Sequence, residues 1–161
     1  MIEIRSVEDS VSLAAARSLV RAHMAAHSKI HDAAAIERVV VALPAPYDGP
    51  RGGLWLAWAG AEALGCVALQ ALSLTSATAE LKRMYVRPEA RGRGVARRLS
   101  EHAIAMAAAR GYATLRLGTL PSMRAAQHLY ESLGFRRIAP YRAEEFGETW
   151  FYERELTAPT S

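Results

Sequence analysis

Residues 89–99 read EARGRGVARRL, with two glycines two positions apart and arginines at 91, 93, 97 and 98. Glycines allow the backbone to turn sharply or to approach a ligand closely. An alanine-rich helical pattern follows, and the first N–H groups of a helix have no acceptor within it. The helix dipole adds roughly half a positive charge at the same end. The combination predicts a site for an anion such as a pyrophosphate.

Three kinds of anionic ligand need to be compared for this segment. A dinucleotide fingerprint requires a small residue where the chain has Arg97, and an acidic residue about 20 positions later, where it reads GYATLRLG. Nucleic acid would use the same arginines, but no helix-turn-helix, zinc-binding or ribonucleoprotein signature accompanies them and the net charge is only +4. Coenzyme A fits better, because backbone N–H groups suit its pyrophosphate and arginine side chains suit a further phosphate.

The composition of the 161 residues is that of a globular chain, with 51% hydrophobic and 22% charged residues. We expect a single domain over residues 1–156 and a flexible tail over residues 157–161. One cysteine, Cys66, excludes an internal disulfide and a multi-cysteine metal site. The acidic N-terminus does not resemble a signal peptide and the apolar runs are too short for a membrane span, so we expect a cytoplasmic protein.

The hydrophobic periodicity predicts alternating strands and helices. Strands are expected at 2–7, 53–60, 63–72, 78–86, 113–119, 135–141 and 149–156, and helices at 8–27, 31–41, 95–110 and 122–133. This order predicts an α/β fold with a mixed sheet of six to seven strands, flanked by about four helices.

Local signals mark where several of these elements begin and end. Asp9 or Ser10 would cap the first helix, and Gly111 and Gly134 would end two later ones. Residues 43–53, with three prolines and three glycines, are expected to form a loop. The apolar face of the first helix would carry Val11, Ala15, Leu19 and Ala22.

Two motifs in the second half of the chain resemble a known family. Arg91-x-x-Gly94-x-Ala96, preceded by MYVRP, is similar to the Q/R-x-x-G-x-G/A signature of the GNAT superfamily of N-acetyltransferases. The later segment AAQHLYESLGF, residues 125–135, resembles that family's A-x-x-L-Y-x-x-x-G-F block. The resemblance covers residues 79–135 in sequence and the whole chain in topology, and it implies the acyl-CoA N-acyltransferase fold.

The resemblance also implies where acetyl-CoA would bind. Backbone N–H groups from Gly92 to Arg97 would hold the pyrophosphate, and the backbone of residues 84–86 would pair with the pantetheine arm, where the family separates two strands. Ser122 is included because the family often has an asparagine at the position of Met123, and the adjacent serine hydroxyl could replace it. The implied cofactor-binding residues are Met84, Tyr85, Val86, Arg91, Gly92, Arg93, Gly94, Val95, Ala96, Arg97 and Ser122.

Two residues are candidates for the chemistry. Acyl transfer requires a neutral amine, a polarised thioester carbonyl and a proton for the leaving sulfur. By the resemblance, Tyr130 protonates the thiolate; the alternative is a tyrosine packed in the core. Glu80 lies eleven residues before Arg91, the spacing of the general base in histone-acetylating members. The alternative for Glu80 is an exposed charge at the end of a strand, paired with Lys82 or Arg116.

The remaining reactive side chains carry weaker predictions. His23, His27 and His31 recur every four residues near Asp32, but without an HExxH motif a polar helix end is favoured over zinc. Cys66 lies in an apolar strand and is interpreted as a core residue.

The acceptor amine is not specified by any motif. By the resemblance, regions 24–53 and 139–152 would contact it, and the acidic loop in the second region weakly favours a cation. The acidic residues are Glu144, Glu145 and Glu148, and aromatic walls could come from Tyr47, Tyr141 and Trp150.

We therefore expect an acyltransferase that moves an acetyl group from acetyl-CoA directly to a primary amine of a small molecule or peptide. No metal, nucleic acid or membrane is expected as a partner, and a homodimer is a further possibility. The alternative is a non-catalytic acyl-CoA-binding sensor module on the same fold.

Overall fold

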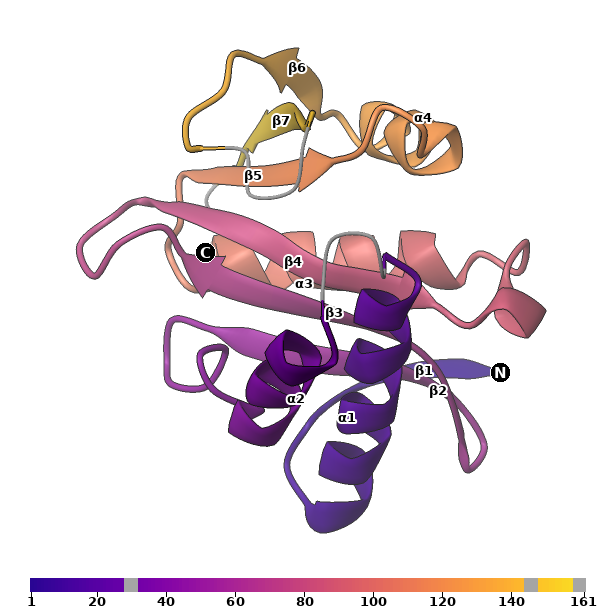
Figure 1. Ribbon diagram of the computed structural model, residues 1–161. Coiled ribbons are helices and arrows are strands. Elements are labelled where there is room, and N and C mark those ends of the chain that lie inside the picture. Colours follow the sequence, from indigo (N-terminus) through magenta and orange to yellow (C-terminus); the bar gives the residue numbers. More distant parts are fainter. Residues whose placement is uncertain (28–31, 144–147, 158–161) are drawn as a thin grey trace. The chain divides into compact units, whose positions relative to one another are not determined.

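A computed structural model describes residues 1–27, 32–143 and 148–157 (Figure 1). In these residues seven strands form one mixed sheet in the order β1-β2-β3-β4-β5-β7-β6, and four α-helices accompany it. The strands are β1 Ile2–Ser6, β2 Gly53–Ala59, β3 Glu62–Ala71, β4 Thr78–Val86, β5 Thr114–Thr119, β6 Arg136–Ile138 and β7 Trp150–Glu155. The helices are α1 Ser10–Ala25, α2 Ala33–Ala42, α3 Val95–Ala109 and α4 Arg124–Ser132, with a short 3-10 helix η1 at Pro88–Ala90. The order of elements and the fold class predicted from the sequence are confirmed.

The chain divides into two compact units. The first comprises residues 1–70 and 81–103, and the second comprises residues 71–80 and 104–161. Strand β4 and helix α3 each contribute residues to both units. No helix of the described ranges is both long and apolar enough to cross a bilayer.

In the first unit, α1 and α2 lie side by side on β2 and β3 and share a core with them (Figure 1). Asp9 caps α1, accepting a hydrogen bond from the backbone N–H of Ser12 at 2.7 Å. Ser12 is buried and its hydroxyl completes this capping box, so the buried face of α1 begins at Ser12 and not at Val11. Leu19 is buried as expected, but Val11 is 69% exposed and its assignment to the core was wrong.

In the second unit, β5 pairs in parallel with β4 and antiparallel with β7, which in turn pairs with β6. The parallel ladder joins Thr78–Glu80 to Thr114–Arg116, at the beginning of both strands. Strand β6 is shorter than predicted, since Pro140 has no backbone N–H for a ladder. Gly134 ends the α4 region with a φ of 89°, as its position indicated.

Candidate functional site

The turn between β4 and α3 lies in the first unit and is built on two left-handed glycines. Gly92 has a φ of 78° and Gly94 a φ of 77°, a conformation that side chains rarely adopt. A Cβ at either position would meet no heavy atom within 4 Å, so the space in front of the turn is open. The N–H of Arg98 donates to the Gly94 carbonyl at 3.1 Å, which leaves the earlier N–H groups of α3 without an acceptor in the helix. Open space and outward donors are what an anion site requires.

Arginine side chains fix this turn and surround it with positive charge. The Nε of Arg91 donates to the Val86 carbonyl at 3.0 Å, and its guanidinium lies 5.7 Å from the centre of the Tyr85 ring. Arg91 therefore also closes the turn, a contact that its place in the motif did not predict. Arg97 is exposed and pairs with Glu101 at 3.6 Å, one helical turn further along.

The end of β4 is anchored to the rest of the first unit. The backbone N–H of Arg87 donates to the Leu64 carbonyl at 2.8 Å, and its Nε donates to the Ala63 carbonyl at 2.9 Å. The same side chain reaches the Ser18 hydroxyl of α1 at 3.3 Å. Val95 of α3 is buried behind the turn, whereas Arg93 and Ala96 are exposed or partly exposed. Contacts with β3 and α1 thus fix the end of β4, next to the backbone that would bind a cofactor.

Strand β4 contains a distortion that the sequence did not reveal. Arg83 has a φ of 56°, immediately before Met84, the first of the residues implied to pair with pantetheine. The Cys66 thiol donates to the Arg83 carbonyl at 3.1 Å, and the Arg83 Nε donates to the Tyr47 hydroxyl at 3.0 Å. Burial raises the pKa of Cys66 to about 12, so this thiol is unreactive and its interpretation as a core residue is confirmed.

His23 of α1 packs against two neighbouring rings. The ring centre of His23 lies 5.8 Å from that of Tyr85 and 5.6 Å from that of His27. Asp32 caps α2 through a 2.7 Å hydrogen bond from the N–H of Ala35. No cluster of three or more metal-binding side chains occurs in the part of the chain that the structure describes. His31 lies outside the described residues.

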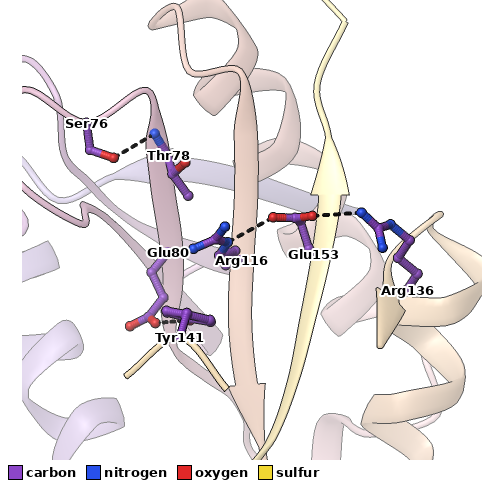
Figure 2. Close-up of polar contacts among 7 residues, drawn as sticks. All are labelled: Ser76, Thr78, Glu80, Arg116, Arg136, Tyr141 and Glu153. Atoms are coloured by element: carbon purple, nitrogen blue, oxygen red, sulfur yellow. Dashed lines mark hydrogen bonds and ion pairs between the residues drawn. The ribbon is translucent and has the colours of Figure 1, made fainter. Parts of the chain in front are cut away.

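Glu80, the base candidate, lies in the second unit and is 4% exposed. Its Oε2 accepts a hydrogen bond from the Tyr141 hydroxyl (Figure 2) and lies 3.0 Å from the Nε of Arg142. The expectation of an exposed strand-end charge was therefore wrong: the carboxylate is buried and pairs with Arg142, while Arg116 pairs with Glu153. A buried carboxylate with two donors on one oxygen is held in a fixed orientation.

The Tyr141 ring contacts a cation and another aromatic ring. The Arg116 guanidinium lies 4.8 Å from its ring centre, and the Phe151 ring lies at the same centroid distance of 4.8 Å. Arg116 is in turn the first member of an ion-pair row with Glu153 and Arg136, at 2.9 and 3.0 Å, across β5, β7 and β6 (Figure 2). Burial, and then the hydrogen bond to Glu80, raise the pKa of Tyr141 well above that of a free phenol.

Tyr130 lies on α4 as expected, 5% exposed, with its ring centre 5.7 Å from that of Phe135. Burial raises the pKa of its phenol to about 12, which keeps the proton on the oxygen at neutral pH. Ser122 is exposed, and the start of α4 has no side-chain cap. The sulfur of Met123 accepts a hydrogen bond from the Thr119 hydroxyl at 3.7 Å.

The region predicted to contact the acceptor is only partly described. Trp150 is half-buried, with the Arg137 guanidinium 3.5 Å from its ring centre, and its Nε1 donates to Glu148 at 3.2 Å. Glu144 and Glu145 lie outside the described residues. Sequence reasoning missed Arg142 and Arg83, because no motif contains Arg142 and only the backbone geometry distinguishes Arg83.

Comparison with known proteins assigns the family. The sequence profile of the acetyltransferase (GNAT) domain matches residues 50–137. The chain belongs to the GNAT acetyltransferase family. Its match runs from the loop before β2 to β6 and includes the glycine turn, Glu80 and Tyr130.

Curated relatives share its central region. The uncharacterised N-acetyltransferase YsnE of Bacillus subtilis is 37% identical over 102 residues, which cover 62% of the GNAT chain and 65% of YsnE. An N-acetylaspartate synthetase of Danio rerio is 39% identical over 97 residues, which cover 60% of the chain and 34% of that enzyme. The matches thus span less than two thirds of each relative's own length.

Solved structures match almost the whole chain. A GNAT acetyltransferase of Staphylococcus aureus superimposes with a TM-score of 0.79 at 20% sequence identity. The match covers 98% of this chain and 100% of the Staphylococcus aureus chain. The Salmonella typhimurium protein yncA, whose structure contains its cofactor acetyl-CoA, has a TM-score of 0.75 at 20% identity, with 99% and 96% of the two chains covered. Likeness at this identity establishes the GNAT fold, as the sequence motifs predicted.

Proposed function

We propose that this GNAT chain transfers an acetyl group from acetyl-CoA directly to a primary amine of a small molecule or peptide. The observation that carries the proposal is the turn before α3, where Gly92 and Gly94 are left-handed and have open space at the position of a Cβ, next to the first N–H groups of the helix. These donors and the surrounding arginines fit a pyrophosphate and a further phosphate. The acetyl-CoA in the Salmonella typhimurium neighbour supports the same cosubstrate.

The backbone of the chain would hold most of this cosubstrate. The N–H groups from Gly92 to Arg97 would contact the pyrophosphate, and the backbone of Met84–Val86 would pair with the pantetheine arm. A backbone N–H near Met84 or Tyr85 would stabilise the negative charge that develops on the thioester oxygen.

Tyr130 and Glu80 would move the two protons of the reaction. The acceptor nitrogen forms a bond to the thioester carbon, and the carbon–sulfur bond breaks. Tyr130, protonated because burial raises its pKa to about 12, gives its proton to the leaving sulfur. Glu80 takes a proton from the amine, directly or through a water molecule, while Tyr141 and Arg142 hold one of its oxygens in place.

An amino acid is the acceptor class that the relatives favour. The Danio rerio relative is named for the synthesis of N-acetylaspartate, an acetylated amino acid, and it is 39% identical over its matched region. We extend this class, though not the individual substrate, to the present chain.

Two measurements test the proposal. Acetyl-CoA should raise the melting temperature, because a ligand that binds only the folded state stabilises it. Thiol release from acetyl-CoA should then be measured across a panel of free amino acids and other primary amines. No thermal shift at saturating acetyl-CoA would refute the cosubstrate, and a shift without thiol release from any amine would favour the sensor module.

A further inference from the structure

Arg83 is the one non-glycine residue with a positive φ in the described ranges 1–27, 32–143 and 148–157. Strained backbone of this kind persists only where neighbouring groups enforce it, and it is concentrated at functional sites. The position matters here, because the strained residue directly precedes the strand segment that would hold pantetheine.

Two contacts within the first unit hold Arg83 in this conformation. The Cys66 thiol fixes its carbonyl at 3.1 Å, and the hydroxyl of Tyr47 accepts from its Nε at 3.0 Å. Tyr47 is 2% exposed and belongs to the core that joins α1 and α2 to the sheet. The hydrogen bond from Nε to Tyr47 restrains the plane of the guanidinium and leaves the N–H groups of its two terminal nitrogens outside that contact.

The charge of this guanidinium has no acidic partner among the residues that the structure describes. Arg83 is half-buried, and none of its recorded contacts is with a carboxylate. Arg116 and Arg142, which are similarly half-buried, each pair with a glutamate at 2.9 and 3.0 Å. A partly desolvated cation is unfavourable unless an anion pairs with it. The two terminal nitrogens of a guanidinium match the two oxygens of a carboxylate.

We infer that Arg83 is a specificity-determining residue that binds a carboxylate of the acceptor, with Tyr47 as its positioning residue. The inference rests on the proposed function and deepens it: the acceptor is an amine that carries a free carboxylate. Tyr47 lies in the loop after α2, within the region expected to contact the acceptor. Arg83 directly precedes residues 84–86, the segment of β4 that would pair with pantetheine. A carboxylate held there would orient its neighbouring amine along the edge of that segment.

The test compares each amino acid with its α-amide, which keeps the amine and removes the negative charge. Wild-type protein at saturating acetyl-CoA should show a higher kcat/KM for the acid than for the amide. Arg83→Gln should lower kcat/KM for the acids about 10- to 100-fold, the effect of losing hydrogen bonds to a charged group, and lower it much less for the amides. Arg83→Lys should restore part of the preference, and Tyr47→Phe should weaken it less than Arg83→Gln does.

Three observations separate the inference from its alternatives. Arg5→Gln, at an exposed arginine of β1, is the matched control and should leave the acid preference intact. The thermal shift with acetyl-CoA should be the same in wild type and Arg83→Gln; a smaller shift in the variant would mean that Arg83 binds a cofactor phosphate instead. Equal kcat/KM values for acids and amides in the wild type, or an equal loss of both in Arg83→Gln, would overturn the inference.

A binding experiment keeps the inference testable without turnover. N-acetyl-L-aspartate and its diamide are titrated calorimetrically into protein saturated with coenzyme A. Binding of the acid alone, lost in Arg83→Gln, supports the assignment, and no binding of the acid to the wild type refutes it. Failure of the proposed function would instead be seen as no thermal shift with acetyl-CoA, whatever the carboxylate result.

Discussion

The glycine turn before α3 and the cluster of Glu80, Tyr141 and Arg142 are built by different means. The turn uses the backbone of consecutive residues, exposed and shaped by two left-handed glycines. The cluster uses side chains that are 61 and 62 residues apart in the chain and that surround a buried carboxylate. A site made of local backbone tolerates change in its side chains, whereas a site made of distant side chains depends on each of them.

The difference matches the two tasks of an acyltransferase. Under the proposed function, binding of the acetyl-CoA pyrophosphate needs only backbone N–H groups, which a fixed turn supplies. Proton transfer and acceptor choice depend on individual side chains, which the rest of the fold must bring together. Substitutions in the turn and in the cluster should therefore have separate effects on cosubstrate binding and on turnover.

Tyr130→Phe removes a proton donor without changing the glycine turn. Turnover should fall about 10²- to 10⁴-fold, the usual contribution of a positioned general acid. The thermal shift with acetyl-CoA should stay at its wild-type size, because the turn does not use this hydroxyl. Steady-state thiol release and thermal denaturation measure the two effects, and full activity in the variant would remove Tyr130 from the mechanism.

Arg142→Gln takes the cation from the buried Glu80 carboxylate. We expect a loss of about 3 kcal/mol in the free energy of unfolding, since the buried carboxylate then lacks its ion pair with Arg142. The double variant Glu80→Gln with Arg142→Gln should recover much of that loss, because no charge then needs a partner. Chemical denaturation of Glu80→Gln, Arg142→Gln and the double variant measures the three losses of stability. Strictly additive losses would show that the pair is not coupled.

Gly94→Leu and Gly60→Leu form a matched pair for the turn. Both glycines are left-handed, with φ of 77° and 59°, and both have open space at a Cβ. Each substitution should therefore cost about 1–2 kcal/mol of stability from backbone strain alone. Only Gly94→Leu should also abolish the thermal shift with acetyl-CoA, since Gly60 lies in the β2–β3 hairpin. Loss of the shift in both variants would point to general strain instead of a specific site.

Alkaline pH should lower the free energy of unfolding, because the buried phenol of Tyr130 ionises less readily in the folded chain. The pKa of Tyr130 is about 12 in the folded chain, against about 10 when unfolded. Below pH 10 both states keep the proton; between pH 10 and 12 only the unfolded state loses it, so stability falls by up to about 1.4 kcal/mol per pH unit. Tyr130→Phe should make the decline between pH 10 and 11 shallower in denaturation experiments. A slope identical to that of the wild type would mean that Tyr130 ionises normally.

The order of elements could be predicted because its signals are local. Hydrophobic periods marked the strands and helices, and Gly111 and Gly134 marked helix ends, both with left-handed φ in the structure. The glycine turn was predicted for the same reason. Two predictions were wrong because of nearby residues. The buried face of α1 begins at Ser12, within the Asp9 capping box, and not at Val11, and Pro140 limits the length of β6.

The contacts of Glu80 could not be predicted from its sequence neighbourhood. Its partners lie beyond β6, and only the folded sheet brings them to β4. Arg83 was missed for another reason, because the sign of its φ depends on Cys66 and Tyr47, which lie on other elements. Residue type and spacing carry no information on such contacts.

The position of Cys66 allows local opening of the sheet to be measured by thiol labelling. It is the sole cysteine of the chain, fully buried, and the burial raises its thiol pKa to about 12. A thiol-reactive probe can reach this sulfur only when β3 and the strained part of β4 open, so the labelling rate measures the frequency of that opening. If an acceptor carboxylate on Arg83 holds this region closed, its presence should slow the labelling before any product is formed.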